Sequence, residues 1–277
     1  MLLGGIALIS TLAAAAFCFG FDAFAGLAWL WMLPAAFLGA FLVLLIAAFL
    51  FLYFACKRVD LDVPQAHDSG FYRRLTYLYI DALIALARVR VHTEGLEQTP
   101  KDGRFLLVCN HQHLADPALL LGFFKRSQLA FISKQENRDM FIVGKLMHRI
   151  MCQTLDRDND RQALKTILKC IQLIKDDEVS IGVFPEGYTS KDGKLHHFRS
   201  GVFKIAQKAN VPIVVCTIQG TRELFHNMKR LKATDVQLHL VGVVPAEELK
   251  GKTAVEIGDR VHAMMAEDLG PDRVAEE

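Results

Sequence analysis

The most suggestive spacing in the sequence separates His111 from Asp116. An apolar run ends just before His111, and Asp116 followed by Pro117 is typical of a helix start, with an N-cap acceptor before proline at the first helical position. Layered α/β folds commonly place active-site residues at such strand ends. A carboxylate five residues further on could hold the imidazole through Nδ1–H and leave the other ring nitrogen free to take a proton from an alcohol. The pattern therefore points to general-base chemistry.

The same segment allows simpler interpretations. Asp116 could be only a helix cap and His111 only a loop histidine, and His113 meets the same crude criterion for a base. Cys109 lies in the apolar run just before the histidine, so a nucleophilic role has to be weighed against a buried strand cysteine, which is the more ordinary state. The spacing by itself does not decide among these interpretations.

Other polar residues also follow apolar runs. In residues 183–190 a strand leads Glu186 into a turn that contains Gly187, where the carboxylate could meet a ligand hydroxyl or simply belong to a surface turn. Lys134 follows another apolar run, and Arg157 precedes a polar stretch. Each of these signals is weak when taken alone.

Strand-like and helix-like segments alternate after residue 88 and must position these side chains. Short apolar runs predict strands at residues 89–94, 105–109, 129–133, 179–184, 211–218 and 236–244. Helical periodicity predicts helices at residues 117–124, 143–151, 161–175, 201–209 and 253–267. This alternation is typical of an α/β layered domain, and we expect a mixed sheet because no helix is predicted before the last long strand.

The first 56 residues predict a membrane anchor. They contain one charged side chain, Asp22, between two apolar runs at residues 2–21 and 27–56. Each run is long enough to cross a bilayer, which takes about 20 apolar residues. We therefore expect residues 1–56 to form a transmembrane helical hairpin, or a single span, and residues 57–277 to form one catalytic domain.

The charge pattern orients this anchor. Lys57 and Arg58 close the second apolar run, and positive residues favour the cytoplasmic side, so we expect a cell-membrane protein whose catalytic domain is cytoplasmic. Residues 23–25 resemble a signal-peptide cleavage site, which is the alternative for the first run. No Lys or Arg precedes that run, and the second span would keep the same orientation in either case.

Residues 71–87 predict an amphipathic helix. Phe71 and Leu86 lie at the two ends of its apolar stripe, and Arg73 and Arg74 lie off the stripe. Such a helix could rest on the membrane surface or pack within the domain.

Composition excludes several classes of protein. All 32 Lys and Arg side chains follow residue 56, together with 29 of the 30 Asp and Glu side chains, which is too small a basic excess to indicate a nucleic-acid binder. The six cysteines form no CxxC pair, and a reduced cytosolic setting fits them best. The sequence contains no GxSxG, P-loop or GxGxxG motif.

The order of the motifs resembles that of the glycerolipid acyltransferase family, which includes the 1-acyl-sn-glycerol-3-phosphate acyltransferases. The family motifs are NHxxxxD, a block from a lysine to a DR-like pair, FPEG with a polar turn, and a strand that contains VP. This chain shows them in that order: Asn110-His111 with Asp116, Lys134 to Asp156-Arg157, Phe184-Pro185-Glu186-Gly187, and Val211-Pro212. The resemblance covers roughly residues 88–245, and four ordered motifs are highly specific.

The resemblance implies a role for each matching residue. His111 would be the general base and Asp116 its orienting partner. The substrate-binding residues would be Lys134 and Arg157 at the acceptor phosphate, and Glu186 and Gly187 at the glycerol. The chain departs from many relatives in two places: Thr189 stands where they carry arginine, and His113 stands where serine is frequent.

The activity implied by the resemblance is transfer of a fatty acyl group from acyl-CoA or acyl-carrier protein to a lysophospholipid hydroxyl. The favoured acceptor is 1-acylglycerol 3-phosphate, which would give phosphatidate. Neither a metal nor a bound cofactor is expected, and the bilayer would be a partner because it holds the acceptor. Alternatives are a thioesterase or lysophospholipase that uses the same His/Asp pair, an acyltransferase for another lysolipid, and a non-catalytic membrane protein of the same fold.

Overall fold

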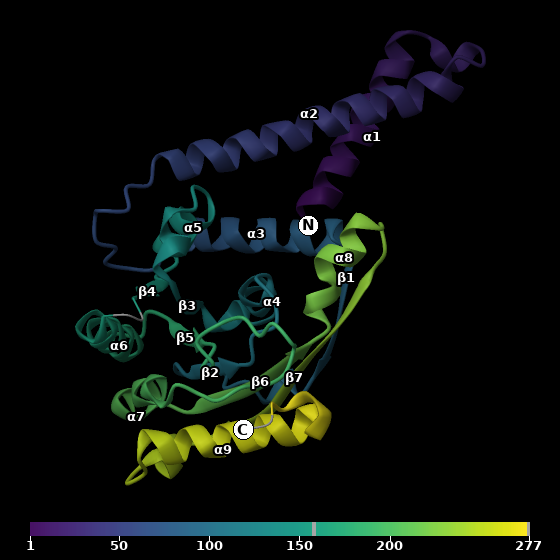
Figure 1. Cartoon of the computed structure of the whole chain (residues 1–277). Coiled ribbons are helices and arrows are strands. Elements are labelled where there is room, and N and C mark those ends of the chain that lie inside the picture. The colour runs from purple at the N-terminus through teal and green to yellow at the C-terminus, as the bar shows by residue number, and fades with distance from the viewer. Residues whose placement is uncertain (157–158, 276–277) are drawn as a thin grey trace. The chain divides into compact units, whose positions relative to one another are not determined.

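The computed structural model describes residues 1–156 and 159–275 and divides the chain into two compact units, Met1–Val63 and Pro64–Glu277. The first unit is a helical hairpin, in which α1 (Leu2–Gly20) and α2 (Trp29–Lys57) are joined by a short turn with one 3-10 helix (Ala23–Ala25) (Figure 1). The turn forms where Asp22 adopts a left-handed conformation with φ of 54°, which aspartate tolerates better than most residues. The helices follow the two predicted apolar runs closely.

Both helices of the first unit are suited to a lipid environment. Their mean hydropathies are 2.2 and 2.8, and each is long and apolar enough to cross a membrane. One side of α1 is buried at every fourth residue, at Ile6, Ser10, Ala14 and Cys18. Such spacing lets two helices approach closely. These properties support membrane association of the hairpin.

A seven-stranded mixed sheet forms the centre of the second unit. Its strands lie in the order β1-β7-β6-β2-β5-β3-β4. Neighbours are parallel except β6 and β7, which are antiparallel. The strands are β1 (Val89–Glu94), β2 (Leu106–Cys109), β3 (Leu129–Lys134), β4 (Gln153–Leu155), β5 (Ser180–Val183), β6 (Ile213–Gln219) and β7 (Thr234–Val244). The mixed sheet predicted from the sequence is confirmed.

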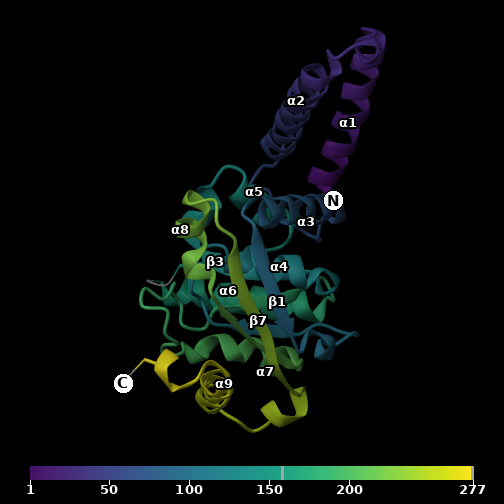
Figure 2. The same cartoon turned by 90° about the vertical axis from the view of Figure 1, so that its right-hand side faces the viewer.

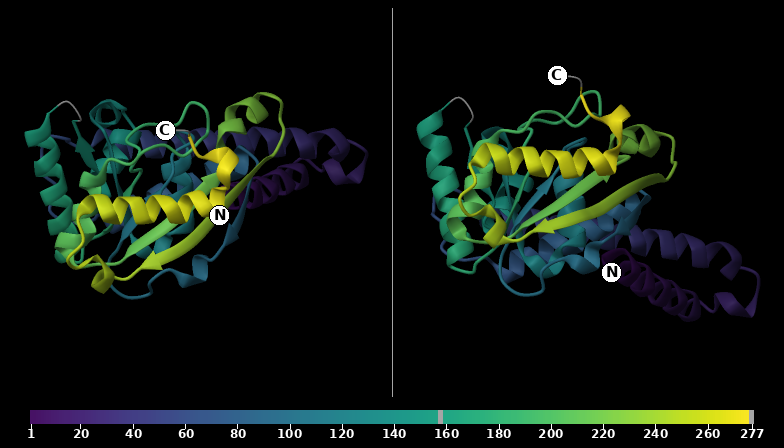
Figure 3. Two further views of the ribbon diagram at one scale, coloured as in Figure 1. Left: turned by 60° about the horizontal axis from the view of Figure 1, so that its bottom comes forward. Right: turned by 90° about the horizontal axis from the view of Figure 1, so that it is seen from below.

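Helices cover both faces of this sheet (Figures 2 and 3). One face carries α3 (Gly70–Leu86) and α4 (Asp116–Phe123), and the other carries α6 (Asp160–Lys175), α7 (Lys204–Ala209) and α9 (Ala254–Leu269). The short helices α5 (Val143–Arg149) and α8 (Leu224–Lys229) belong to the connections before β4 and β7.

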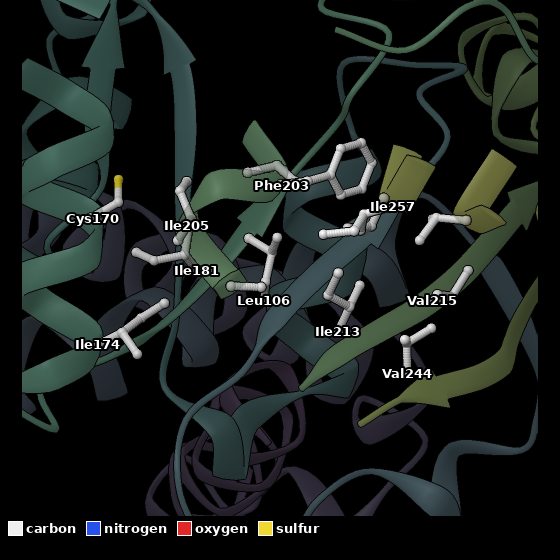
Figure 4. Packing of buried hydrophobic residues seen from close by; sticks show 14 of the residues in the cluster. Leu106, Cys170, Ile174, Ile181, Phe203, Ile205, Ile213, Val215, Val244 and Ile257 are labelled. Carbon is white, nitrogen blue, oxygen red and sulfur yellow. The ribbon is translucent and has the colours of Figure 1, made fainter. Parts of the chain in front are cut away.

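Alternation along the central strands builds two separate cores. In β2, Leu106 and Val108 belong to the core under α6, α7 and α9, whereas Leu107 and Cys109 belong to the core under α3 and α4. Figure 4 shows the first of these cores, in which Leu106 meets side chains from the neighbouring strands and covering helices. Both faces of the strand are buried, so β2 is a continuous apolar run that ends where the polar motif begins.

Three details differ from the sequence predictions. Strand β4 was not predicted, because three half-buried residues carry no recognisable period. The predicted helix at residues 201–209 divides into a 3-10 turn (Ser200–Phe203) and α7. A short helix, α8, does precede the last strand, but two turns of helix are too short to show periodicity.

The predicted apolar stripe of α3 is only partly buried, because Phe71 and Leu86 are exposed. Arg73, which lies off that stripe, is only 4% exposed. Arg73 pairs with Asp68 and donates to the carbonyl oxygens of Leu129 at 2.8 Å and Ile150 at 3.0 Å. Burial is possible because these acceptors satisfy the guanidinium.

Candidate active site

Parallel neighbouring strands bring residues of three sequence motifs to one edge of the sheet. Strands β2, β5 and β3 are adjacent and parallel. His111 follows β2, Glu186 follows β5, and Lys134 ends β3. Their carboxyl ends therefore meet, as is usual for ligand sites in open α/β sheets.

His111 and Asp116 form a hydrogen-bonded pair. The Nδ1 atom of His111 lies 2.9 Å from Oδ2 of Asp116, which is the first residue of α4. The same oxygen accepts the backbone N–H groups of Gln112 and His113, both at 2.7 Å. Asp116 is 0% exposed, so these three donors hold its carboxylate in one orientation. The bond at Nδ1 leaves Nε2 to act on a ligand.

The imidazole ring of His111 is fixed on its flat side as well. It stacks on Phe184 with a centroid distance of 4.2 Å and an interplanar angle of 21°. Its side chain is 15% exposed, and Nε2 has no hydrogen-bond partner among the residues that the structure describes. A positioned imidazole with one open nitrogen has the geometry of a general base.

Asn110 fastens the end of β2 to β6. Its Nδ2 donates to the carbonyl oxygen of Ile218 at 2.9 Å, and its Oδ1 accepts the N–H of Ile218 at 2.8 Å. The buried amide thus replaces a pair of backbone hydrogen bonds where β2 stops. This role was not predicted, because nothing in the sequence places β6 beside β2.

Glu186 joins His111 to the following loop. The Glu186 carboxyl is 1% exposed, and its two oxygens accept the N–H of His111 at 3.2 Å and the N–H of His196 at 3.3 Å. Gly187 follows with φ of +82°, a conformation that favours glycine. Contact of these two residues with the acceptor's glycerol stays a prediction.

Burial perturbs the protonation of Glu186. Desolvation raises the pKa of Glu186 to about 8, against the opposing effect of the two backbone donors. The negative charges of Asp116 and Asp192 push the pKa in the same direction as burial. The carboxyl is therefore held close to its titration point at neutral pH.

The loop after Gly187 carries polar contacts that were not predicted. The N–H of Ser190 donates to the carbonyl oxygen of His111 at 2.8 Å. Asp192 accepts from Ser190 Oγ at 2.8 Å and pairs with His196 Nε2 at 2.9 Å. Hydrogen bonds hold the pKa of Asp192 well below its usual range, and the bond from the Lys194 N–H contributes most. The only sequence signal for this network was the polar turn itself.

The structure places His113 and Cys109 in surroundings that do not suit the roles of base and nucleophile. His113 accepts the Ala115 N–H on its Nδ1 at 3.2 Å, its ring packs on Phe225, and burial lowers its pKa. Burial raises the pKa of the Cys109 thiol well above its ordinary value, with neighbouring Cys216 adding to the shift. A thiol held neutral in this way is a poor nucleophile.

The two predicted phosphate ligands differ in what the structure shows. Lys134 is exposed at the carboxyl end of β3, the same edge as His111. Arg157 follows β4 in the sequence and lies outside the described residues. Phosphate binding by either residue stays a prediction.

Comparison with known proteins agrees with this arrangement. A family profile described as Acyltransferase matches residues 90–219, which include His111, Asp116 and Glu186. The crystal structure of a 1-acyl-sn-glycerophosphate acyltransferase from Thermotoga maritima is similar, with a TM-score of 0.59 and 27% identity over 71% of this chain and 78% of that chain. The chain belongs to the acyltransferase family.

Curated relatives of this acyltransferase chain carry consistent names. A probable 1-acyl-sn-glycerol-3-phosphate acyltransferase of Mycoplasma pneumoniae is 30% identical over 64% of this chain and 66% of its own length. A chloroplastic 1-acyl-sn-glycerol-3-phosphate acyltransferase of Arabidopsis thaliana is 34% identical over 55% of this chain and 44% of its own length. The chain thus spans from under half to about two thirds of the length of these two relatives.

Proposed function

We propose that this acyltransferase moves a fatty acyl group from acyl-CoA or acyl-carrier protein to the free hydroxyl of a lysophospholipid. The favoured acceptor is 1-acylglycerol 3-phosphate, with phosphatidate as product. The observation that carries the proposal is the His111–Asp116 bond of 2.9 Å, which leaves His111 Nε2 open at the ligand edge of the sheet. The names of the relatives support the choice of acceptor.

In the proposed reaction, His111 Nε2 takes the proton of the acceptor hydroxyl while that oxygen attacks the thioester carbonyl carbon. Asp116 stabilises the resulting imidazolium and keeps its tautomer, as the aspartate does in a serine hydrolase triad. The tetrahedral intermediate then breaks its carbon–sulfur bond, and the thiolate leaves with the proton that His111 carried. The substrate oxygen takes the place of an enzyme nucleophile, and the step requires neither a metal nor a bound cofactor.

We further propose that the hairpin Leu2–Lys57 anchors the enzyme in the cell membrane, with the catalytic unit on the cytoplasmic side. Lys57, at the end of α2, supports this orientation. A lysolipid can leave its acyl tail in the bilayer and present its head group to the site. We expect no nucleic-acid partner.

The test measures which acceptor captures the acyl group. Purified full-length protein in detergent, given labelled acyl-CoA and lysophosphatidate, should form phosphatidate faster than free fatty acid. Acyl-carrier-protein thioesters and a panel of other lysolipids would define donor and acceptor. Free fatty acid as the main product, with or without acceptor, would instead identify a hydrolase built on the same His111–Asp116 pair.

A further inference from the structure

The segment that returns after the Glu186–Gly187 turn lies beside the proposed base. The N–H of Arg199 donates to the carbonyl oxygen of Pro185 at 2.8 Å, and the N–H of His196 donates to Glu186. The other carboxyl oxygen of Glu186 accepts the N–H of His111. Arg199 is therefore tied, through the turn, to the residue that carries the proposed chemistry.

The side chain of Arg199 covers Gly187. A Cβ atom added to Gly187 would lie 2.9 Å from Nε and 3.0 Å from Cδ of Arg199. No other residue type at position 187 would leave this space, and the positive φ of Gly187 adds a second reason for glycine. The absence of a Cβ thus lets the arginine lie along the turn.

The guanidinium of Arg199 is available to a ligand. Arg199 is exposed, and within residues 1–156 and 159–275 its side chain makes no hydrogen bond or ion pair. By contrast, Arg222 donates to the backbone oxygens of Lys191 and Asp192. The Asp192 carboxylate is hydrogen-bonded to Ser190, Lys194 and His196.

We infer that Arg199 binds the phosphate of the acceptor and helps select phosphorylated lysolipids. The inference rests on the proposed function. A guanidinium offers a fork of donors that matches a phosphate bidentately. Thr189, which stands where many relatives carry arginine, has no charge, and Arg199 offers a guanidinium beside the same turn. A donor such as acyl-CoA also carries phosphates, and the experiment separates the two sources.

The experiment compares Arg199→Ala and Arg199→Lys in the full-length protein. Removing a charge-assisted bond to phosphate should raise the KM for lysophosphatidate roughly 10- to 100-fold, with little change in the KM for acyl-CoA. Lysine should restore only part of the loss, because a point charge does not reproduce the fork. The matched control is Arg126→Ala, which should change neither KM. Arg126 is exposed and lies in the turn that precedes β3, at the opposite edge of the sheet.

Ligand-induced thermal stabilisation provides a readout that does not require transfer. Lysophosphatidate should stabilise the wild-type protein more than monoacylglycerol does, and Arg199→Ala should lose that difference while keeping the melting temperature of the unliganded protein. An unchanged KM and an unchanged difference would overturn the inference, as would a rise confined to acyl-CoA. If the wild type bound lysophosphatidate selectively through Arg199 but transferred no acyl group, the proposed function would fail and the inference would stand.

Discussion

At the scale of single residues, the two buried carboxyl groups beside His111 differ in how they are hydrogen-bonded. Asp116 receives three donors on one oxygen, whereas Glu186 has two weaker backbone donors and is equally buried. Burial, with no cationic partner among the residues that the structure describes, raises the pKa of Glu186 to about 8. The two carboxyl groups therefore respond differently to pH although both lie next to His111.

We predict that His111→Ala lowers acyl transfer roughly 10²- to 10⁴-fold, because general-base catalysis contributes about that much. His113→Ala should keep substantial activity, since the His113 Nδ1 already accepts a backbone N–H. Initial rates with lysophosphatidate, measured on variants with native melting temperatures, provide the comparison. The reverse ranking of the two variants would show that the base has been assigned wrongly.

We predict that Glu186→Gln changes the dependence of stability on pH. A carboxyl group whose pKa rises from 4.5 to about 8 on folding favours the folded state most below pH 4.5 and loses that contribution as the pH approaches 8. The slope for one such group is about 1.4 kcal/mol per pH unit. Between pH 5 and 8 the wild-type melting temperature should therefore fall relative to that of Glu186→Gln. Parallel curves would mean that Glu186 is ionised throughout this range.

At the scale of elements, buried polar side chains hold helices and strands in register. Asn110 joins β2 to β6 by two hydrogen bonds, and Arg73 joins α3 to the start of β3 and to Ile150, just after α5. Each side chain bonds backbone groups that an apolar side chain of similar size would leave without a hydrogen-bond partner.

We predict that Arg73→Ala lowers the free energy of unfolding by about 3–5 kcal/mol, because it leaves Asp68 buried without its partner. Arg74→Ala is the matched control: Arg74 is exposed and, within the part of the chain that the structure describes, donates only to the backbone oxygen of Gly70, so the change should be within about 0.5 kcal/mol. Chemical or thermal unfolding of the purified protein in detergent measures both. Similar, small effects of the two changes would argue that the buried pair contributes little.

At the scale of the whole molecule, an apolar hairpin and a charged α/β unit share one chain. The hairpin presents large apolar side chains on its surface, such as Leu38, Val43 and Phe54, which water would not favour. The α/β unit has the buried core of a water-soluble domain. Under the proposed function the site at the sheet edge would act on a lipid acceptor, and the hairpin would hold the enzyme at the membrane that contains this acceptor.

We predict that a cysteine at residue 191 and one at residue 22 lie on opposite sides of the membrane. Lys191→Cys, in the exposed loop after Ser190, should react with an impermeant maleimide only after permeabilisation, because Lys57 and Arg58 favour a cytoplasmic catalytic unit. Asp22→Cys, in the hairpin turn, should react in intact cells. Reaction of the residue 191 variant from outside intact cells would refute the orientation, and wild-type protein reports any reaction of the native cysteines.

The sequence alone was sufficient for features that depend on neighbouring residues. The five-residue spacing of His111 and Asp116 allowed their pairing without deciding it, and the order of the four motifs then favoured it; the 2.9 Å distance agrees with that prediction. Apolar runs of membrane length likewise predicted α1 and α2 without reference to the rest of the chain. The α/β class followed in the same way from alternating local periodicities.

Only the tertiary structure decided which distant segments meet. Glu186 bonds the backbone of His111 across 75 residues of sequence because β2 pairs with β5, and strand order is not encoded in the spacing of either strand. The burial of Arg73 and the position of Arg199 over Gly187 have the same origin. From the sequence alone, a charged side chain is predicted to lie on the surface. Its burial is favourable only when acceptors from other elements surround it, and the fold brings those acceptors together.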